Sequence, residues 1–509
     1  MTKNNLLLAF IVLLKFILQY ALISPQYDLQ RDEYLHLDMA SHLQWGYLSV
    51  PPVTSWISTV IGFLGNGVFW VKFFPALFGA LTIVVVWKTV EVLNGNLFAL
   101  LLSASCILFS ALLRLNTLFQ PNSLDVLCWV SFYFTVIHYF KTEQAKWLYY
   151  GAFVFALGSL NKYNIVFSAA GLLPAVLLTA QRKVVANTHF YFAVLLALLL
   201  VSPNLYWQYQ NGFPVIHHLQ ELTDTQLVHV ERITFLKNQL LFFSGALLII
   251  PIALYALVVY PPFQKYRAFF WVLPFTLLIF TYLKAKDYYA IGLYPLYIAF
   301  GSVYLAQLLE EGWKRYLQLF FIALPILSFV LMLKVAFPNK SPDYIVKHSA
   351  IHKKLGLLRW EDGKDHALPQ DFADMLGWKE LAVKVDSIFS ALPNPDETLV
   401  LCDNYGQAGA VNYYKTNPKL TAHSFNADYV NWLQYDRSIV DAILVKEKDD
   451  EDKERITERP HFDTVYLAYK RINQYALEDT ISIYVLRGAK IDVNKRIKEE
   501  ADRKKKYQE

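Results

Sequence analysis

Two adjacent carboxylates, Asp32 and Glu33, stand in a short charged segment directly after the first long apolar run of the chain. The same segment contains a phenol and an imidazole, Tyr34 and His36. Carboxylates are costly to hold beside a bilayer, so the pair indicates a functional site that could activate a hydroxyl. The alternative is a solvated loop that only ends a helix.

Three further polar segments, at residues 120–125, 161–164 and 284–289, interrupt apolar runs in a similar way. They supply carboxylate, ammonium and phenol groups through Asp125, Lys162, Lys284, Lys286, Tyr288 and Tyr289. This combination of groups is suited to activating a hydroxyl and to stabilising a leaving phosphate.

Each of these side chains also has a structural interpretation. Asp125 could complement the dipole of a helix that begins near it, and Lys162 could be an ordinary loop lysine. One of Lys284 and Lys286 is expected to be an interface anchor. The two tyrosines suit the aromatic belt of a membrane protein equally well.

The composition of the chain is that of an integral membrane protein. Of its 509 residues, 55% are hydrophobic and only 17% are charged, which is more apolar than soluble domains are. The net charge of +5 is small for this length and gives no case for nucleic-acid binding. Cys106, Cys128 and Cys402 form neither a disulfide framework nor a metal-binding spacing.

About eleven apolar runs are candidate membrane helices. They cover residues 6–23, 68–92, 96–113, 122–140, 147–161, 164–180, 187–203, 235–259, 268–283, 287–308 and 315–336. A shorter apolar piece at 53–65 follows Pro51–Pro52 and is predicted to be interfacial or re-entrant. No small-residue cleavage site follows the first run, so we expect it to be a retained signal anchor.

The short loops on one side of this arrangement carry positive charges. These are Lys88, Lys141, Lys146, Arg182, Lys183, Lys265, Arg267, Lys314 and Arg315. The positive-inside rule therefore predicts a cytoplasmic N-terminus, and it places all four polar segments and the chain after residue 337 outside.

Several cations fall on the outer face, where the positive-inside rule does not favour them. Among them are Arg31, Arg114, Lys162, Lys284 and Lys286. A bound anion, such as a lipid phosphate at the interface, would account for them. Snorkelling of each long side chain to water is the alternative.

The composition changes at about residue 338, after which charged runs appear and no apolar run is long enough to span a membrane. The pattern predicts buried strands at 398–402, 464–468 and 482–486, a turn at 403–406 and a helix from about 407. We therefore expect a soluble α/β domain at 338–509 that ends in a basic tail.

The order of several short motifs resembles bacterial glycosyltransferase family 39, whose relatives include protein O-mannosyltransferases and the lipid A aminoarabinose transferase. After the acidic pair come Trp45–Gly46–Tyr47 and Pro51–Pro52. They are followed by the motifs at 160–163, 202–208, 211–219, 286–289, 294–295 and 403–410. The resemblance extends over nearly the whole chain.

This resemblance implies a GT-C fold, with a polytopic all-α membrane domain at 1–337, an active-site first outer loop at about 24–67, and an extracytoplasmic α/β domain. It implies an enzyme of the bacterial inner membrane that transfers a hexose or pentose from a polyprenyl phosphate, with inversion at the anomeric carbon. The acceptor would be a hydroxyl of a glycan, a lipid or a protein.

By position, Asp32 matches the catalytic base, Glu33 its partner and Asp125 a second acid near the sugar. Lys162 and Lys286 match positions that face the donor phosphate. We add three further candidate phosphate-binding cations, Lys284, Arg31 and Arg114. The candidate sugar or acceptor contacts are Tyr34, His36, Trp45, Tyr47, Trp207, His217, Tyr288 and Tyr289, although interfacial tryptophans are often anchors.

Two residues depart from the family pattern. Asp287 stands where many relatives have proline, and Val50 stands where they often have a polar residue before the double proline. We expect no required cofactor. The carboxylates and imidazoles near Asp32 and His217 could bind a divalent metal ion, but the sequence does not establish a set of ligands for one.

A lipid-linked sugar transporter or flippase is the rival hypothesis. Such a protein would be expected to place charges along a path through the membrane. Lys15 and His138 lie within apolar runs and favour it, whereas the other charges gather at one face and favour an enzyme.

Overall fold

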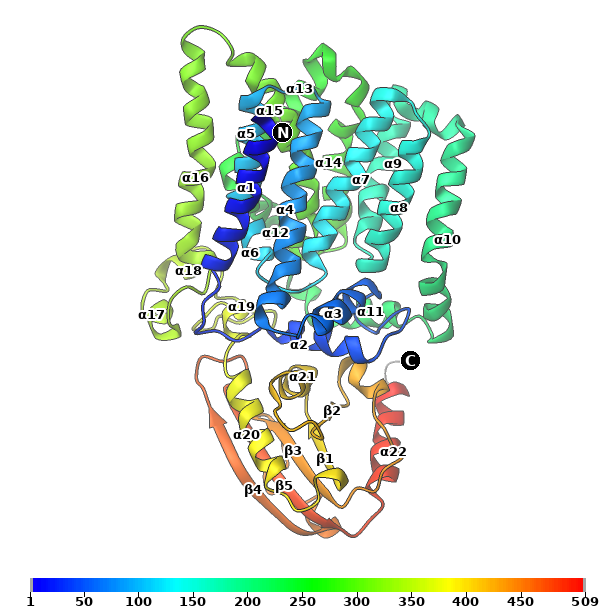
Figure 1. Cartoon of the computed structure of the whole chain (residues 1–509), viewed down its shortest axis with the longest axis vertical. Coiled ribbons are helices and arrows are strands. Elements are labelled where there is room, and N and C mark those ends of the chain that lie inside the picture. The colour runs from blue at the N-terminus through cyan, green and yellow to red at the C-terminus, as the bar shows by residue number, and fades with distance from the viewer. Residues whose placement is uncertain (1–2, 507–509) are drawn as a thin grey trace.

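The computed structural model, which describes residues 3–506, has a bundle of long helices at one end and a sheet at the other (Figure 1). The main helices of the bundle are α1 (Lys3–Ala21), α4 (Val68–Val92), α5 (Leu97–Leu108), α7 (Asn122–Thr142), α8 (Lys146–Asn161), α9 (Ile165–Leu177), α10 (Thr188–Gln210), α13 (Ile249–Val259), α14 (Ala268–Tyr282), α15 (Tyr294–Leu308) and α16 (Leu317–Ala336). Most of the predicted apolar runs therefore form helices of nearly the predicted extent.

Six helices within residues 3–506 are long and apolar enough to cross a membrane, and up to seven if the bent pair Ile165–Leu177 and Ala180–Ala186 is one span. Shorter apolar helices include α3 (Val53–Phe63), α5, α13 and α14. The polytopic helical architecture is confirmed. The span count of about eleven is not confirmed by this criterion and stays a prediction.

One predicted span, 235–259, is broken in the structure. It forms α12 (Arg232–Phe242) and α13, separated by the short turn Ser244–Ala246. A Cβ at Gly245 would lie only 2.4 Å from the Cα of Pro325 in α16. The break thus lies where the backbone of another helix passes against the chain, a contact that apolar composition does not reveal.

Helix α15 is at the centre of the bundle, since 89% of its span is buried inside the protein. Aromatic side chains, among them Trp129 and Phe300, are fully buried in the same core. By contrast α1, α10 and α16 are each only 17% buried. Their exposed apolar side chains are those that lipid would cover.

A layer of short helices separates the bundle from the sheet (Figure 1). It contains α2 (Arg31–Asp38), Met39–Ser41, α3, α6 (Leu112–Leu115), α11 (Pro214–Thr225), Leu227–His229, Asp287–Leu293, α17 (Pro342–Lys347), α18 (Ala350–Lys354) and α19 (Gln370–Ala373). Helix α1 runs from the far end of the bundle to this layer, so the first loop and the sheet share one end of the molecule.

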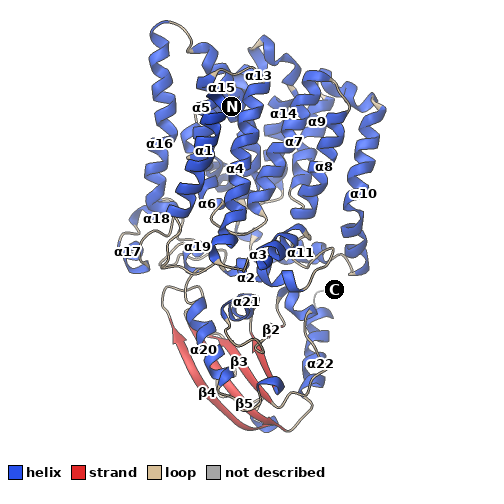
Figure 2. Ribbon diagram, in the orientation of Figure 1, coloured by secondary structure: helices blue, strands red, loops and turns tan. Residues whose placement is uncertain are grey.

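Strands occur only in the C-terminal part among the described residues (Figure 2). They are β1 (Thr398–Cys402), β2 (Ala422–Ser424), β3 (Asp441–Glu447), β4 (Phe462–Ile472) and β5 (Thr480–Ala489), in the order β2-β1-β3-β5-β4. Strand β1 is parallel to β2 and β3, whereas β5 is antiparallel to β3 and β4. Helices α20 (Trp378–Ser390), α21 (Tyr405–Tyr414) and α22 (Val493–Lys506) accompany this mixed sheet.

Candidate active site

Helix α2 begins at a capping box that orders the acidic pair. The side chain of Gln30 accepts from the backbone N–H of Asp32 at 2.8 Å, and the N–H of Gln30 donates to Glu33 Oε2 at 2.8 Å. Both carboxylates thus lie in the first turn, where the helix dipole favours negative charge. The segment predicted as a polar loop is therefore a short helix with a fixed start.

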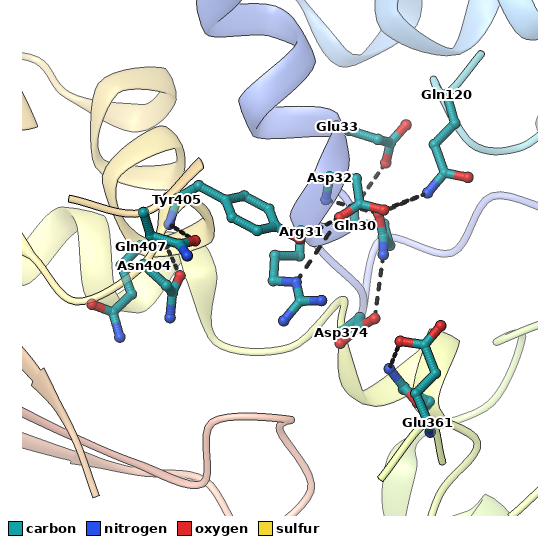
Figure 3. Close-up of polar contacts among 12 residues, drawn as sticks. Gln30, Arg31, Asp32, Glu33, Gln120, Glu361, Asp374, Asn404, Tyr405 and Gln407 are labelled. Atoms are coloured by element: carbon teal, nitrogen blue, oxygen red, sulfur yellow. Dashed lines mark hydrogen bonds and ion pairs between the residues drawn. The ribbon is translucent and has the colours of Figure 1, made fainter. Parts of the chain in front are cut away.

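Asp32 lies between the bundle and the sheet domain (Figure 3). Its Oδ1 accepts from the hydroxyl of Tyr405 at 2.7 Å, and its Oδ2 accepts from Gln120 Nε2 at 3.1 Å. The side chain of Asp32 is 35% exposed. A carboxylate that is held by two donors and still open to solvent can accept a proton from an incoming hydroxyl.

Glu33 lies in the opposite environment, with 0% of its side chain exposed. Lys72 Nζ of α4 is 2.7 Å from each carboxylate oxygen, and the backbone N–H of Phe119 donates to Oε1 at 2.6 Å. Lys72 is itself buried. The ion pair is buried on both sides and attaches α2 to the helix bundle.

A chain of side-chain amides connects Asp32 with Lys162. Gln120 donates to Asp32, and its own Oε1 accepts from Asn122 Nδ2 at 2.9 Å. Lys162 Nζ then donates to Asn122 Oδ1 at 2.7 Å. The same ammonium group lies 4.3 Å from the centre of the Tyr289 ring, a cation–π contact.

Asp125 is buried at the start of α7 and belongs to the same neighbourhood. Its Oδ2 accepts from Asn164 Nδ2 at 2.8 Å. That amide also donates to the backbone oxygen of Tyr289 at 2.9 Å. The structure thus brings all four polar segments together: the acidic pair, the segment at 120–125, the turn at 161–164 and, through Tyr288 and Tyr289, the segment at 284–289.

Lys286 is paired with Glu361, whose Oε1 lies 2.5 Å from the ammonium nitrogen. Burial acts to lower the pKa of Lys286, but the charge of Glu361 and, more weakly, that of Asp32 outweigh it, so the pKa lies above its usual value. Within residues 3–506 the side chain of Lys284 makes no recorded hydrogen bond or ion pair, and its backbone is left-handed with φ 52°. The two lysines therefore differ, and Lys284 fits the interface anchor.

Two cavities lie near the start of α2. The first, of about 360 Å³, is lined by apolar residues near the end of α1, by Lys72 and Arg114, and by Asp28 and Lys379 among others. The second, of about 560 Å³, lies at the carboxyl ends of β1 and β3 and is lined by Arg31, Tyr405 and Glu447 among others. One cavity thus combines apolar walls with cations, whereas the other is lined by polar groups of the sheet domain.

Comparison with known proteins agrees with this architecture. The family model described as dolichyl-phosphate-mannose-protein mannosyltransferase matches residues 49–207. The lipid A galacturonosyltransferase RgtD of Rhizobium johnstonii is 24% identical over 324 residues, which are 61% of this chain and 66% of that relative. The chain thus spans just under two thirds of the length of this relative.

Crystal structures of ArnT from Cupriavidus metallidurans, bound to undecaprenyl phosphate and in the apo state, each superpose with a TM-score of 0.61. Each match covers 95% of this chain and 98% of ArnT at 12% identity. At that identity the likeness shows the fold. The chain therefore has the fold of ArnT, and residues 49–207 resemble the mannosyltransferase family.

Several predicted sugar contacts are buried side chains at the interface between the helix bundle and the sheet domain. Tyr34 is fully buried and lies edge-on to Trp378 of α20. The hydroxyl of Tyr47 donates to the backbone oxygen of His42 at 2.9 Å. His36 is buried against Phe119, and burial lowers the pKa of its imidazole.

The other predicted aromatic contacts lie near α10 and α11. Trp45 is 48% exposed, and Trp207 Nε1 donates to Gln44 Oε1 at 3.1 Å. A Cβ at Gly46 would lie 2.4 Å from the Trp207 ring, so this glycine permits the loop to pack on α10. His217 is partly buried on α11, and its imidazole makes no recorded hydrogen bond among residues 3–506. None of these side chains is hydrogen-bonded to Asp32.

The remaining predicted cations lie around the ends of α2 and α6. The Arg31 guanidinium lies over the Tyr405 ring at 5.2 Å and 4.0 Å from Asp32 Oδ1. Arg114 faces Asp371 at 3.8 Å. Arg114 lines the first cavity, and Arg31 lines the second.

Three important residues were not among the sequence candidates: Tyr405, Gln120 and Lys72. Gln120 and Tyr405 belong to motifs noted in the sequence, but nothing there indicated that either contacts Asp32. Lys72 carried a usable signal, since a lone lysine in an apolar run needs a partner. Within residues 3–506, no group of three or more His, Cys, Asp or Glu side chains is placed to hold a metal ion. Metal dependence stays open.

Proposed function

We propose that the enzyme transfers a sugar from a polyprenyl-phosphate donor to an acceptor hydroxyl at the extracytoplasmic face of the bacterial inner membrane, with inversion. The observation that carries the proposal is Asp32 itself. It is a partly exposed carboxylate, fixed by two hydrogen bonds at the junction of bundle and sheet domain. A largely apolar cavity that Lys72 and Arg114 help to line lies at the segment before its helix, and a polar cavity reaches Arg31 at the start of the helix.

In the proposed reaction, Asp32 removes the proton of the acceptor hydroxyl while the hydroxyl oxygen attacks the anomeric carbon. The bond from that carbon to the phosphate oxygen breaks, and polyprenyl phosphate leaves. Lys162 and Lys286 stabilise the negative charge that develops on the phosphate. Because a phosphate is already a stable anion, no general acid is required.

The proposal assigns Glu33 the role of an anchor. Its oxygens are occupied by Lys72, the N–H of Phe119 and the N–H of Gln30. It is also closed to solvent, so an acceptor hydroxyl has no route to it. These contacts support Asp32, and not Glu33, as the base.

The donor and acceptor classes rest partly on relatives. One ArnT crystal structure contains undecaprenyl phosphate, which supports a polyprenyl-phosphate donor here. The names of the relatives refer to lipid A and to protein acceptors. We therefore propose an acceptor hydroxyl on a glycan, a lipid or a protein, and a hexose or pentose as the transferred sugar.

The test is turnover by the purified chain in lipid vesicles. A panel of undecaprenyl-phosphate hexoses and pentoses is supplied with candidate acceptors, and released undecaprenyl phosphate is measured. Release that depends on Asp32, together with an inverted anomeric configuration by NMR, is expected. Release that is unchanged in Asp32→Asn contradicts the proposed mechanism.

The flippase alternative has one structural observation in its favour. Lys15 is buried in α1 and donates to Gln19, and no carboxylate of residues 3–506 is recorded as its partner. His138, the other residue of interest, stacks on Trp147 with ring centres 3.8 Å apart. A flippase would move a labelled lipid-linked sugar across vesicles without cleaving it, and it would do so equally well with Asn at position 32.

A further inference from the structure

Helix α21 of the sheet domain packs unusually closely on α2. Cβ atoms built at Gly406 and Gly409 would lie 2.4 Å from Arg31 Cγ and 2.7 Å from Tyr34 Cβ. The two glycines are three residues apart, so they lie on one face of α21. Any larger side chain at either position would push the two helices apart.

The start of α21 is fixed as well. Asn404 is its N-cap, and the side-chain oxygen accepts from the N–H of Gln407 at 3.0 Å. The next residue, Tyr405, is therefore the first of the helix, and its ring is directed at α2 (Figure 3). The motif at 403–410 thus combines a cap, a phenol and two glycines that allow close contact.

The Tyr405 hydroxyl donates to Asp32 Oδ1 at 2.7 Å across 373 residues of sequence. Burial, and then the nearby Asp32 carboxylate, raise the pKa of this phenol well above its usual value. The hydroxyl is therefore protonated at neutral pH and acts as a donor. Gln120, which comes from the bundle side, is the only other side chain recorded as a hydrogen-bond donor to Asp32 among the described residues.

We propose that Tyr405 is a positioning residue for the base, so that the sheet domain completes the active site through α21. The inference rests on the proposed role of Asp32. The hydrogen bond fixes the orientation of the Asp32 carboxylate and stabilises its ionised form. It gives the sheet domain a role in the reaction besides any role in acceptor binding.

Helix α21 also offers a matched control. The hydroxyl of Tyr413 donates to the backbone oxygen of Asn66 at 2.9 Å. This hydrogen bond likewise joins the sheet domain to the membrane-proximal part of the chain, but it does not involve Asp32. Tyr413→Phe therefore removes the same chemical group from the same helix without touching the proposed base.

The experiment compares Tyr405→Phe and Tyr413→Phe in the full-length enzyme, with an undecaprenyl-phosphate sugar that the wild type cleaves. We expect Tyr405→Phe to lower kcat about 10- to 100-fold with little change in the KM for donor. The acid limb of its pH–rate profile should move to higher pH, because the ionised carboxylate has lost a donor. Tyr413→Phe should change kcat less than about twofold.

A loss of activity caused only by loosened packing would lower kcat in both variants and leave both pH profiles in place; that result overturns the inference. Equal activity of Tyr405→Phe and wild type overturns it too, provided that Asp32→Asn is inactive. If Asp32→Asn is fully active, the proposed function fails first. Apparent Tm values and gel-filtration profiles establish that each variant is folded.

Discussion

The two sides of α2 carry the same chemical group in contrasting surroundings. On the anchored face, Glu33 is closed to solvent and bound to Lys72 and the N–H of Phe119. On the open face, Asp32 is partly exposed and bound to Tyr405 and Gln120. Adjacent carboxylates in one helical turn thus have different partners, and we infer that their surroundings make one an anchor and the other a base.

The largest difference between the two faces is expected in activity. Asp32→Asn keeps the shape of the side chain but cannot accept a proton, so transfer should fall about 100- to 10 000-fold. The apparent Tm should stay close to that of the wild type, because the amide oxygen can still accept from Tyr405. Measurements of carrier release and of thermal unfolding check both statements. A large loss of Tm would show that Asp32, like Glu33, stabilises the fold.

The anchored face is expected to affect stability. Glu33→Gln leaves the buried ammonium group of Lys72 without a counter-charge, which should cost about 3–5 kcal/mol. In Lys72→Met/Glu33→Gln both charges are gone, so the double variant should be more stable than Glu33→Gln alone. Denaturant titration in detergent measures the free energy of unfolding of the wild type, the two single variants and the double variant. Additive effects of the two substitutions would show that the ion pair does not anchor α2.

Side-chain amides connect Asp32 on the open face with Lys162, and substitution of this lysine is expected to have a smaller effect on activity. Lys162→Gln removes the cation at the end of the amide chain from Asp32 and should lower kcat about 10- to 100-fold. Lys284→Gln is the matched control, because the ammonium group of Lys284 has no recorded partner among residues 3–506, and it should change kcat less than about twofold. Equal losses in the two variants would contradict a specific role for Lys162.

Much of the helix bundle could be predicted from the sequence, because the membrane imposes length and composition on each span. The runs at 68–92 and 122–140 correspond closely to α4 and α7. The predicted strands at 398–402, 464–468 and 482–486 lie within β1, β4 and β5. Strand β3 (Asp441–Glu447) was missed, although its first five residues are buried.

The sequence indicated which segments form the candidate site, but it did not indicate which side chains contact one another there. A loop was expected where α2 forms, although Gln30 and Glu33 have the spacing of a capping box. The partners of Asp32 could not be predicted, because Tyr405 is 373 residues away and meets it only when α21 packs on α2. Sequence patterns report local periodicity, whereas these contacts depend on how two domains pack.

A last, smaller effect concerns Asp374, which supports the open face by accepting from Gln30 Nε2 at 3.2 Å. Burial raises the pKa of Asp374 from 3.8 to about 7, although the charge of Arg31 opposes the shift. Between about pH 4 and pH 7 the folded protein therefore holds a proton that the unfolded chain has lost. The contribution of Asp374 to the free energy of unfolding is fully present below about pH 4, and it is lost as the pH rises to about 7.

Asp374→Asn removes this dependence while keeping an oxygen for Gln30. The variant should match the wild type at about pH 4 and below, and have an apparent Tm a few degrees higher at pH 8. Thermal unfolding followed by tryptophan fluorescence across this pH range measures the difference. A variant that is less stable than the wild type at pH 8 would contradict this prediction. It would mean that the ionised Asp374 carboxylate, through Arg31, stabilises the fold, so that the open face also contains an anchoring carboxylate.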